Sequence, residues 1–248
     1  MLAIIGGSGL TRLSTLAIAH REVVRTPYGE PSSALIFGQI AGREVVFLAR
    51  HGHGHTIPPH RVNYRANVWA LKQRGVDTIL AVASVGAISA RCAPGDLVLP
   101  DQLIDYTGGR YSTFFDGEDR NVVHVDFTHP YSAALRSRCL AAARAAGIAM
   151  HDGGVYGAVS GPRLETAAEI NRMERDGATI VGMTGMPEAA LARELGIAYA
   201  VIAVIVNHAA GRGESAQAVA IERIAGILET AMDKTKILID HVVQGGAA

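Results

Sequence analysis

Residues 49–71, which read ARHGHGHTIPPHRVNYRANVWAL, are the stretch from which the fold and the site are best interpreted. The apolar run Val45 to Ala49 precedes them and is typical of a buried strand that leaves the core. The sixteen residues from Arg50 to Arg65 then hold three arginines, four histidines and two prolines, before a helical pattern begins. Cationic and titratable side chains gathered at a strand end usually meet an anionic or polar ligand. We therefore expect this loop to hold an oxyanion, and specifically phosphate.

Apolar runs and helical patterns alternate along the whole chain. Strands are predicted at residues 2–5, 34–40, 44–49, 78–85, 97–99, 101–105, 153–159, 179–182 and 197–206, and helices at 63–74, 130–146, 166–175, 187–195 and 216–242. This alternation, without a linker or an internal repeat, predicts one α/β domain over residues 1–248, with helices flanking a mixed, twisted sheet. Residues 107–129 show no clear period and are a candidate lid or subunit contact.

Charge and composition exclude several classes of function. Lys and Arg number 23 and Asp and Glu number 23, so the formal net charge is zero and nothing favours nucleic acid or an acidic membrane. No stretch reaches the roughly 18 apolar residues of a membrane span. The first residues lack the basic region of a signal peptide, and a cytoplasmic protein is expected. Cys92 and Cys139 form no zinc-binding pattern.

Polar and glycine-rich clusters lie where the predicted strands end, which is the usual place for a site in such sheets. The first strand runs into Gly6-Gly7-Ser8-Gly9. This turn lacks the third glycine of a dinucleotide fingerprint and the lysine of a P-loop, so it can equally be a structural turn. Later clusters are centred on Ser84, Ser160 to Thr166, Met183 to Glu188, and Asn207 with His208.

The histidines of the central loop could in principle bind a metal, because alternate residues of an extended segment point the same way. No carboxylate or cysteine accompanies them in the sequence. We therefore expect no metal, and we interpret His53 and His60 as loop or interface residues.

Together these clusters resemble the trimeric purine nucleoside phosphorylase and methylthioadenosine phosphorylase family, over almost the whole chain. The resemblance is densest at residues 49–52, 55–57, 62–71, 94–96, 161–162, 183–184 and 187–188, and the central loop is most similar to the methylthioadenosine branch. It implies the nucleoside phosphorylase fold, a homotrimer and a pentosyltransferase activity without a cofactor. In the family reaction, inorganic phosphate is the co-substrate and attacks C1′ of the ribosyl group as the bond to purine N9 breaks.

The resemblance also assigns residues to the phosphate and the sugar. Ser8, Arg50, His51 and Thr184 match the family's phosphate ligands. Ala83 departs from the pattern, since the family usually has Thr or Asn there, and Ser84 is expected to supply a hydroxyl or an amide instead. Met183 matches the methionine beneath the ribose, and Leu164 is expected beside the ribose or the base.

Two further positions concern the purine. Glu165 and Asn207 match the pair with which purine nucleoside phosphorylases recognise 6-oxopurines, whereas the adenine-specific branch has aspartates at the positions of Asn207 and Ala209. Glu165 can accept N1–H of hypoxanthine or guanine, and Asn207 can bond N7 and O6. Adenine would leave the carboxylate unpaired, a mismatch of about 1–3 kcal/mol or more.

The 5′ side of the sugar is expected to be apolar. Purine nucleoside phosphorylases place a histidine near the 5′-hydroxyl, and that position aligns with Ile221, close to Val219 and Ile224. In the trimer, His124 or Phe127 of a neighbouring subunit is expected to complete this pocket. The expected reaction is therefore phosphorolysis of 5′-methylthioinosine to hypoxanthine and 5-methylthioribose 1-phosphate, in purine salvage.

Four alternatives stay open at this point. The chain could be a general inosine or guanosine phosphorylase, which differs in accepting a 5′-hydroxyl. It could be a methylthioadenosine phosphorylase, which Asn207 and Ala209 disfavour. A nucleosidase would use water, and strict dependence on phosphate would exclude it. A nucleotide-binding sensor on the same fold is disfavoured because Arg50 and Thr184 are present.

Overall fold

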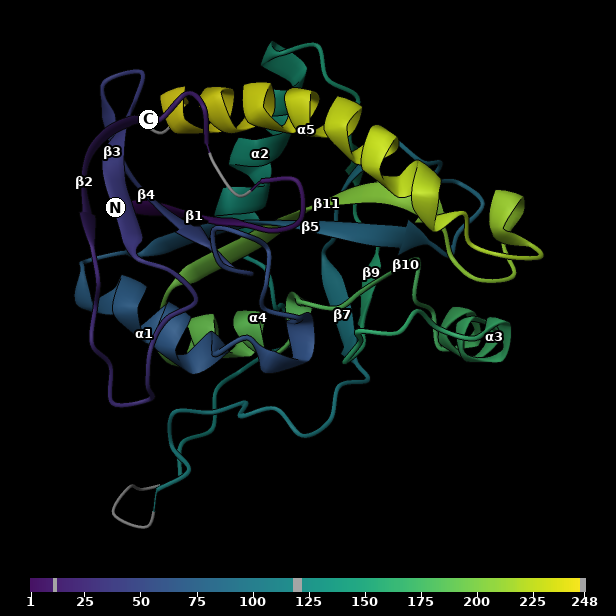
Figure 1. The fold of residues 1–248 in the computed structure, drawn as a ribbon, viewed down its shortest axis with the longest axis horizontal. Helices are drawn as coiled ribbons and strands as arrows, with labels where there is room; N and C mark the ends of the chain where they lie inside the picture. The colour runs from purple at the N-terminus through teal and green to yellow at the C-terminus, as the bar shows by residue number, and fades with distance from the viewer. Residues whose placement is uncertain (11–12, 118–121, 246–248) are drawn as a thin grey trace.

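The computed structural model describes residues 1–10, 13–117 and 122–245, and within these residues the strands form a single sheet flanked by helices (Figure 1). The strands are β1 (Leu2–Gly6), β2 (Ala17–Glu22), β3 (Leu35–Ile40), β4 (Arg43–Ala49), β5 (Thr78–Ala87), β6 (Leu97–Leu99), β7 (Gln102–Asp105), β8 (His151–Asp152), β9 (Val155–Ala158), β10 (Ile180–Gly182) and β11 (Ala198–His208). The α-helices are α1 (Tyr64–Gln73), α2 (Ala133–Ala145), α3 (Ala167–Arg175), α4 (Gly185–Glu194) and α5 (Ile221–Gln244), and the 3₁₀ helices are η1 (Pro59–Arg61) and η2 (Gly213–Ser215). This is the predicted α/β architecture; the expectation of a single domain stays a prediction.

The ten-residue strand β5 lies at the centre of the sheet. It pairs in parallel with β1 and β11 and, near its end, antiparallel with β10. The strand order is β2-β3-β4-β1-β5-β10-β9-β7, with β11 joining β5 to β6, and β6 pairing with β8. The sheet is therefore mixed, as predicted, and β1, β4, β5 and β11 end at one edge because they are parallel.

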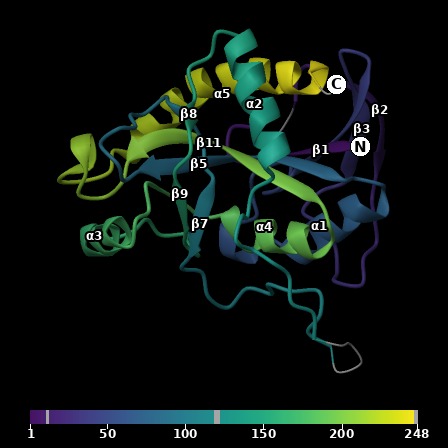
Figure 2. The same ribbon diagram turned by 180° about the vertical axis from the view of Figure 1, so that it is seen from behind.

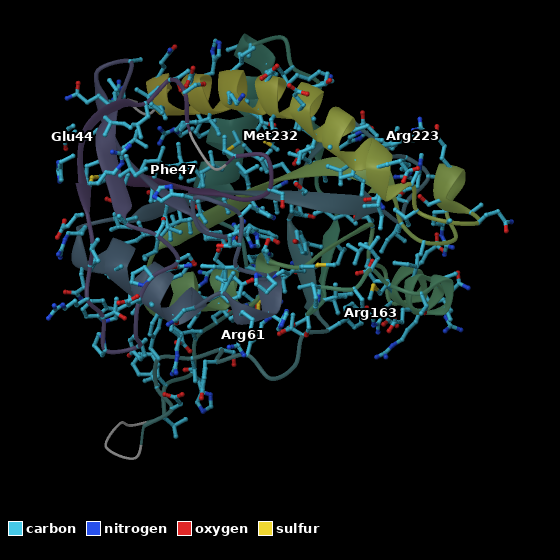
Figure 3. The ribbon with its side chains drawn as sticks, in the orientation of Figure 1. Glu44, Phe47, Arg61, Arg163, Arg223 and Met232 are labelled. Atoms are coloured by element: carbon cyan, nitrogen blue, oxygen red, sulfur yellow. The ribbon has the colours of Figure 1, made fainter. Side chains whose placement is uncertain are left out.

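Each face of the sheet is covered by its own pair of helices. Along β1 the residues alternate: Ala3 and Ile5 pack into one core with α1 and α4, and Leu2 and Ile4 pack into the other with α2 and α5. Figures 1 and 2 show α5 and α2 on one side of the sheet and α1 and α4 on the other. In Figure 3, Met232 of α5 lies between that helix and the sheet, in the core that also contains Phe47.

The helices that were predicted all form, although two begin later than expected. Asn63 caps α1, since its side chain accepts a bond of 3.1 Å from the amide of Ala66. The second helix was predicted from Pro130 but begins at Ala133, after the cap Ser132. The last helix was predicted from about residue 216 but begins at Ile221. The chain forms the 3₁₀ helix η2 shortly before it, and Ala220, the residue that precedes α5, has a ψ of 82°, which is not helical.

The remaining features of the fold are strands β2 and β8 and the irregular segment between residues 107 and 129. Strands β2 and β8 were not predicted; β2 is an edge strand whose residues are almost all exposed, so it lacks the apolar alternation that marks a half-buried strand. Between residues 107 and 129, the described part contains neither helix nor strand, as predicted. This segment extends away from the body of the molecule below α1 and α4 in Figure 1.

Candidate functional site

A cavity of about 230 Å³ opens where the central strands end. The residues that line it are Gly7, Ser8, Arg50, His51, His55, Pro59, Ala83, Ser84, Val85, Gly86, Leu164, Glu165, Val181, Gly182, Met183, Thr184, Val206, Asn207 and Ile224. The structure therefore brings together nine of the ten residues that the sequence analysis placed in the site; the exception is Ile221. Their individual roles stay predictions.

The first wall of the cavity follows from the register of β1 and β4. Gly6 pairs with Ala49, and the amide of Arg50 donates to the carbonyl of Gly6 at 3.0 Å, so Ser8 and Arg50 leave the sheet side by side. Gly7 has to be a glycine, because a Cβ there would lie 2.6 Å from the carbonyl oxygen of Val82 and 3.0 Å from Nη1 of Arg50. The glycine-rich turn thus makes room for the arginine.

Arg50 is completely buried and is held by another buried charge. Its Nε and Nη2 each donate to a carboxylate oxygen of Glu188 at 2.7 Å, and its Nη1 donates to the carbonyl of Val82 at 2.9 Å. Burial alone would lower the pKa of Arg50, but the Glu188 carboxylate outweighs it and raises that pKa above its ordinary value. The guanidinium is therefore charged and fixed in one orientation.

His51 is buried beside Arg50 and is neutral. Its Nδ1 lies 2.8 Å from the carbonyl oxygen of Ile57, and because a carbonyl only accepts, Nδ1 carries the proton. Burial, and then the nearby Arg50 cation, lower the pKa of His51 to about 4. Its Nε2 is therefore unprotonated at neutral pH and can accept a hydrogen bond from an O–H group of hydrogen phosphate or of the sugar.

His55 is a cavity residue that the sequence analysis did not assign. Its ring lies 4.7 Å from that of His51, and its Nε2 lies 3.4 Å from Oγ of Ser8. Partial burial lowers the pKa of His55. The alternation of histidine and glycine in the loop was the available signal, but it could not separate His55 from the outward-facing His53 and His60, both exposed here.

Thr184 and Met183 enter the cavity from the turn between β10 and α4. Thr184 is the N-cap residue of α4 and lines the cavity; its side chain makes no capping bond and hydrogen-bonds to the hydroxyl of Tyr156. Its amide donates to the hydroxyl of Tyr156 at 3.4 Å. Met183 packs closely on Gly161, where a Cβ would lie 2.4 Å from the methionine sulfur. The turn thus offers a hydroxyl and an apolar surface next to each other.

Ser84 has an unusual environment in the middle of the cavity. Its Oγ is buried and has no hydrogen-bond partner among the described residues. Buried hydroxyls are normally bonded, so an unpaired one that lines a cavity indicates a ligand. The family usually has Thr or Asn at the position of Ala83. The unpaired Oγ favours the hydroxyl of Ser84, rather than its amide alone, as the group that replaces that polar side chain.

Asn207 reaches the opposite end of the cavity because β11 is irregular there. The pairing of β11 with β5 shifts register between Ile205 and Asn207, and such a bulge redirects the following side chain. Asn207 then lies opposite Gly86, where a Cβ would come within 3.3 Å of its amide nitrogen. That nitrogen donates to the carbonyl of His208 at 2.6 Å.

Glu165 and Leu164 come from the loop before α3. Thr166 and Glu169 form a capping box at the start of α3, and Glu169 also binds Arg163 through two bonds of 2.7 and 2.8 Å. Figure 3 shows Arg163 on the outer side of this loop. Glu165 is half-buried, and burial raises the pKa of its carboxyl group. The loop is thus anchored on both sides of Glu165.

The predicted 5′ residue is displaced by one helical turn. Ile224 lines the cavity, whereas Ile221 is the first residue of α5, is 65% exposed and lies outside the lining. The two residues are three apart and share one face of α5, and Ile224 lies further along the helix than Ile221, its exposed first residue. In the single chain the apolar wall is therefore Ile224.

Two residues behind the cavity were not identified as functional from the sequence. Glu188 ends the predicted cluster that begins at Met183, and Tyr199 lies in the strand predicted at 197–206, but neither residue was assigned a role. No local pattern marks their pairing with Arg50, since Glu188 is 138 residues away in the chain. A buried Glu in an otherwise apolar helix face is the signal that could have been noticed.

A metal-binding cluster and a membrane-spanning helix are both absent from the described residues. In residues 1–10, 13–117 and 122–245, no group of three or more His, Cys, Asp or Glu side chains is placed to hold a metal ion. None of the helices in those ranges is long and apolar enough to span a membrane.

Comparisons with known proteins agree with this geometry. A protein named "probable S-methyl-5′-thioinosine phosphorylase" from Pseudomonas syringae pv. tomato is 54% identical over 241 residues, covering 97% of each chain. A "probable 6-oxopurine nucleoside phosphorylase" from Thermococcus kodakarensis is 49% identical over 215 residues, covering 85% of this chain and 80% of that protein. The structure of methylthioadenosine phosphorylase from Schistosoma mansoni, in complex with adenine, superposes with a TM-score of 0.93 at 32% identity, covering 98% of this chain and 90% of that one. The model of the phosphorylase superfamily matches residues 1–244, and the chain belongs to that superfamily.

Proposed function

We propose that the protein catalyses the phosphorolysis of 5′-methylthioinosine, giving hypoxanthine and 5-methylthioribose 1-phosphate. The observation that carries this proposal is one cavity whose lining contains both the expected phosphate ligands, Arg50 among them, and the two expected purine ligands, Glu165 and Asn207. Relatives with 48–54% identity named as probable S-methyl-5′-thioinosine phosphorylases support the same substrate. The role would be purine salvage.

The reaction follows from the residues expected to hold the phosphate and those expected to hold the purine. A phosphate oxygen held by Arg50, Ser8 and Thr184 forms the new bond to C1′, and the bond from C1′ to N9 breaks with its electron pair passing to the purine. Negative charge develops on the base at N7 and O6, where the remaining N–H of Asn207 can donate. Fixed donors aimed at developing charge usually contribute the largest catalytic term. Phosphate is a co-substrate, and the proposal needs no cofactor.

Specificity at the base rests on complementary hydrogen bonds. A 6-oxopurine presents N1–H, which the Glu165 carboxylate can accept, whereas adenine presents a lone pair at N1. A buried carboxylate left unpaired disfavours adenine by about 1–3 kcal/mol. At the other end of the sugar, Ile224 offers a methylthio group an apolar contact and offers a 5′-hydroxyl no partner.

We also propose that the protein acts as a homotrimer in the cytoplasm. The exposed position of Ile221 and the exposed residues near His124 support the first part, because a neighbouring subunit could close the 5′ side of the cavity. His124 is exposed, while Phe127 packs partly against the core of its own chain, so His124 is the better candidate for the contact.

The test is a set of initial rates on methylthioinosine, inosine, guanosine and methylthioadenosine, with and without phosphate. We expect methylthioinosine to have the highest kcat/KM and all turnover to require phosphate. Equal use of inosine would replace the proposal with a general 6-oxopurine phosphorylase. A preference for methylthioadenosine would contradict the role of Glu165 and Asn207, and turnover without phosphate would indicate a nucleosidase.

A further inference from the structure

Glu188 lies directly behind the phosphate end of the cavity without lining it. Its side chain has no exposure to solvent, and its carboxylate binds the equally buried Arg50 through two bonds of 2.7 Å. A buried carboxylate is unfavourable unless it is paired and hydrogen-bonded, so these contacts account for its presence. These contacts also determine which N–H groups of Arg50 remain free to bind a ligand.

The donors of Arg50 can be counted. A guanidinium has five N–H groups, and three of them are used by Glu188 and by the carbonyl of Val82. The two that remain are one on Nη1 and one on Nη2, and Arg50 belongs to the cavity wall. Two N–H groups on neighbouring guanidinium nitrogens can bond oxygens of one phosphate. Glu188 therefore turns the arginine so that this unused pair serves the cavity.

Tyr199 fixes Glu188 in turn. Its hydroxyl donates to Oε1 of Glu188 at 2.8 Å, the same oxygen that accepts from Nη2 of Arg50. The Tyr199 ring is buried and stacks on that of Tyr131, with centroids 6.1 Å apart. The hydroxyl of Tyr131, although buried, has no hydrogen-bond partner among the described residues. Only one of these two stacked tyrosines therefore acts on the carboxylate.

Helix α4 connects this pair to a second phosphate ligand. Thr184 and Glu188 lie at the start of α4, on either side of Met186, whose backbone is not helical (φ −120°, ψ 141°), so one short segment sets the positions of the Thr184 hydroxyl and, through Glu188, of the Arg50 fork. The carboxylate also balances the formal charge of the arginine. The cradle would thus hold phosphate through oriented N–H and O–H groups more than through net charge.

We propose that Glu188 and Tyr199 are positioning residues for phosphate, which hold the Arg50 guanidinium in the one orientation that presents two N–H groups to the cavity. The proposal rests on the proposed function, since it assumes that the cavity takes phosphate at Arg50. It goes further because it predicts that Glu188 and Tyr199, which line no part of the cavity, control the affinity for phosphate and not the affinity for the nucleoside.

The test compares Tyr199→Phe with Tyr131→Phe. Each removes one buried hydroxyl from the same stack, but only the first removes a bond to Glu188. We expect Tyr199→Phe to raise the KM for phosphate about tenfold, with the KM for methylthioinosine nearly unchanged, because a lost hydrogen bond to a charged group corresponds to roughly that factor. Tyr131→Phe should leave both KM values unchanged.

A second variant tests the carboxylate itself. Glu188→Asp keeps the charge but shortens the side chain, so it cannot reach both guanidinium nitrogens, and it should raise the KM for phosphate more than Tyr199→Phe does. Phosphate titrations by calorimetry, with melting temperatures, give the same comparison without turnover. The proposal is overturned if Tyr199→Phe lowers the melting temperature but leaves phosphate affinity unchanged, or if both substrates lose affinity equally. Failure of the proposed function would appear differently, as wild-type protein that phosphorolyses none of the nucleosides.

Discussion

Asn207 is prepared for its proposed task by the backbone next to it. Its Nδ2 donates to the carbonyl of His208 at 2.6 Å, which fixes the amide with the nitrogen on that side. An amide nitrogen carries two N–H groups, so one remains for the purine. A carboxylate oxygen in the same place would face the carbonyl oxygen of His208 and would have no proton to offer. Replacing the asparagine with aspartate would therefore remove two hydrogen bonds, the one to the carbonyl of His208 and the one offered to the purine.

We expect Asn207→Asp to lower kcat/KM for methylthioinosine about 100-fold at neutral pH, which is typical of removing one donor to developing charge. The loss should shrink as the pH falls, because protonation restores an O–H donor at this position. Initial rates against pH measure both effects. Asn171→Asp is the matched control, since Asn171 is an exposed residue of α3 that accepts from Arg212 outside the cavity. An unchanged rate in Asn207→Asp would contradict the assignment.

Glu165 gives the base pocket a dependence on pH. Burial raises the pKa of its carboxyl group, so protonation in the folded protein begins at a higher pH than for an exposed glutamate. Above that pKa the carboxylate accepts N1–H of a 6-oxopurine. Below it the neutral acid is a donor, which suits N1 of adenine instead.

We therefore expect the ratio of kcat/KM for methylthioinosine to kcat/KM for methylthioadenosine to fall as the pH is lowered from about 8 to about 5. Taking the ratio removes the titration of phosphate, which affects both substrates alike. In Glu165→Gln the ratio should lie below that of the wild type at neutral pH and should not change with pH through this residue. A wild-type ratio that stays constant over the range would remove Glu165 from base recognition.

The turn from β10 into α4 is built around close contacts that only glycine permits. A Cβ on Gly182 would lie 2.1 Å from the hydroxyl of Tyr156, which is itself completely buried and accepts from the amide of Thr184. Both the strand end and the Thr184 hydroxyl depend on this packing. Stability and phosphate binding are therefore coupled in one short segment.

We expect Gly182→Ala to lower the free energy of unfolding by about 1–3 kcal/mol or more, as overpacking of a rigid core does. Adding Tyr156→Phe should restore part of the loss, because it removes the oxygen that the new methyl group would meet. Gly226→Ala is the control: it lies in α5 with open space around it, and it should stabilise the protein by about 0.5–1 kcal/mol. Denaturant unfolding measures all four proteins. A double variant no more stable than Gly182→Ala would show that Tyr156 is not the source of the strain.

The elements also show what a sequence can and cannot reveal. Ser8, Arg50, Ser84 and Asn207 could be predicted as neighbours because parallel strands end at one edge of a sheet, and local patterns locate strand ends well. The partner of Arg50 could not, because a buried ion pair joins elements distant in sequence. Nor could the sequence decide which residue near the start of α5 lines the cavity, because Ile221 was placed by its resemblance to a family position and Ile224, three residues further on, is the one in the wall.

At the scale of the whole molecule, the residue predicted for the 5′ side of the sugar lies on an exposed surface of the single chain. Ile221 is 65% exposed at the start of α5, which Figure 2 shows at the end of the molecule away from the chain termini. The exposed large apolar residues of the irregular segment are Tyr111, Val122, Val123 and Val125, at 71%, 78%, 41% and 37%. His124 lies among them. Two incomplete surfaces on one chain are what a ring of identical subunits would join, each segment against the next subunit's cavity.

This arrangement predicts complementation between two impaired variants. Asn207→Ala damages the base pocket of its own chain, and His124→Ala damages the 5′ pocket of the neighbouring chain, if the sites are shared. Each variant alone should have low kcat/KM on methylthioinosine. In every trimer that contains both variants, one of the three sites should combine an intact Asn207 with an intact His124 and regain activity, because a closed ring of two kinds of chain has one junction of that kind. Differently tagged chains purified in two steps isolate the mixed trimers, and homotrimers of each variant carried through the same steps are the control. Mixed trimers no more active than the better variant would show that each chain completes its own cavity.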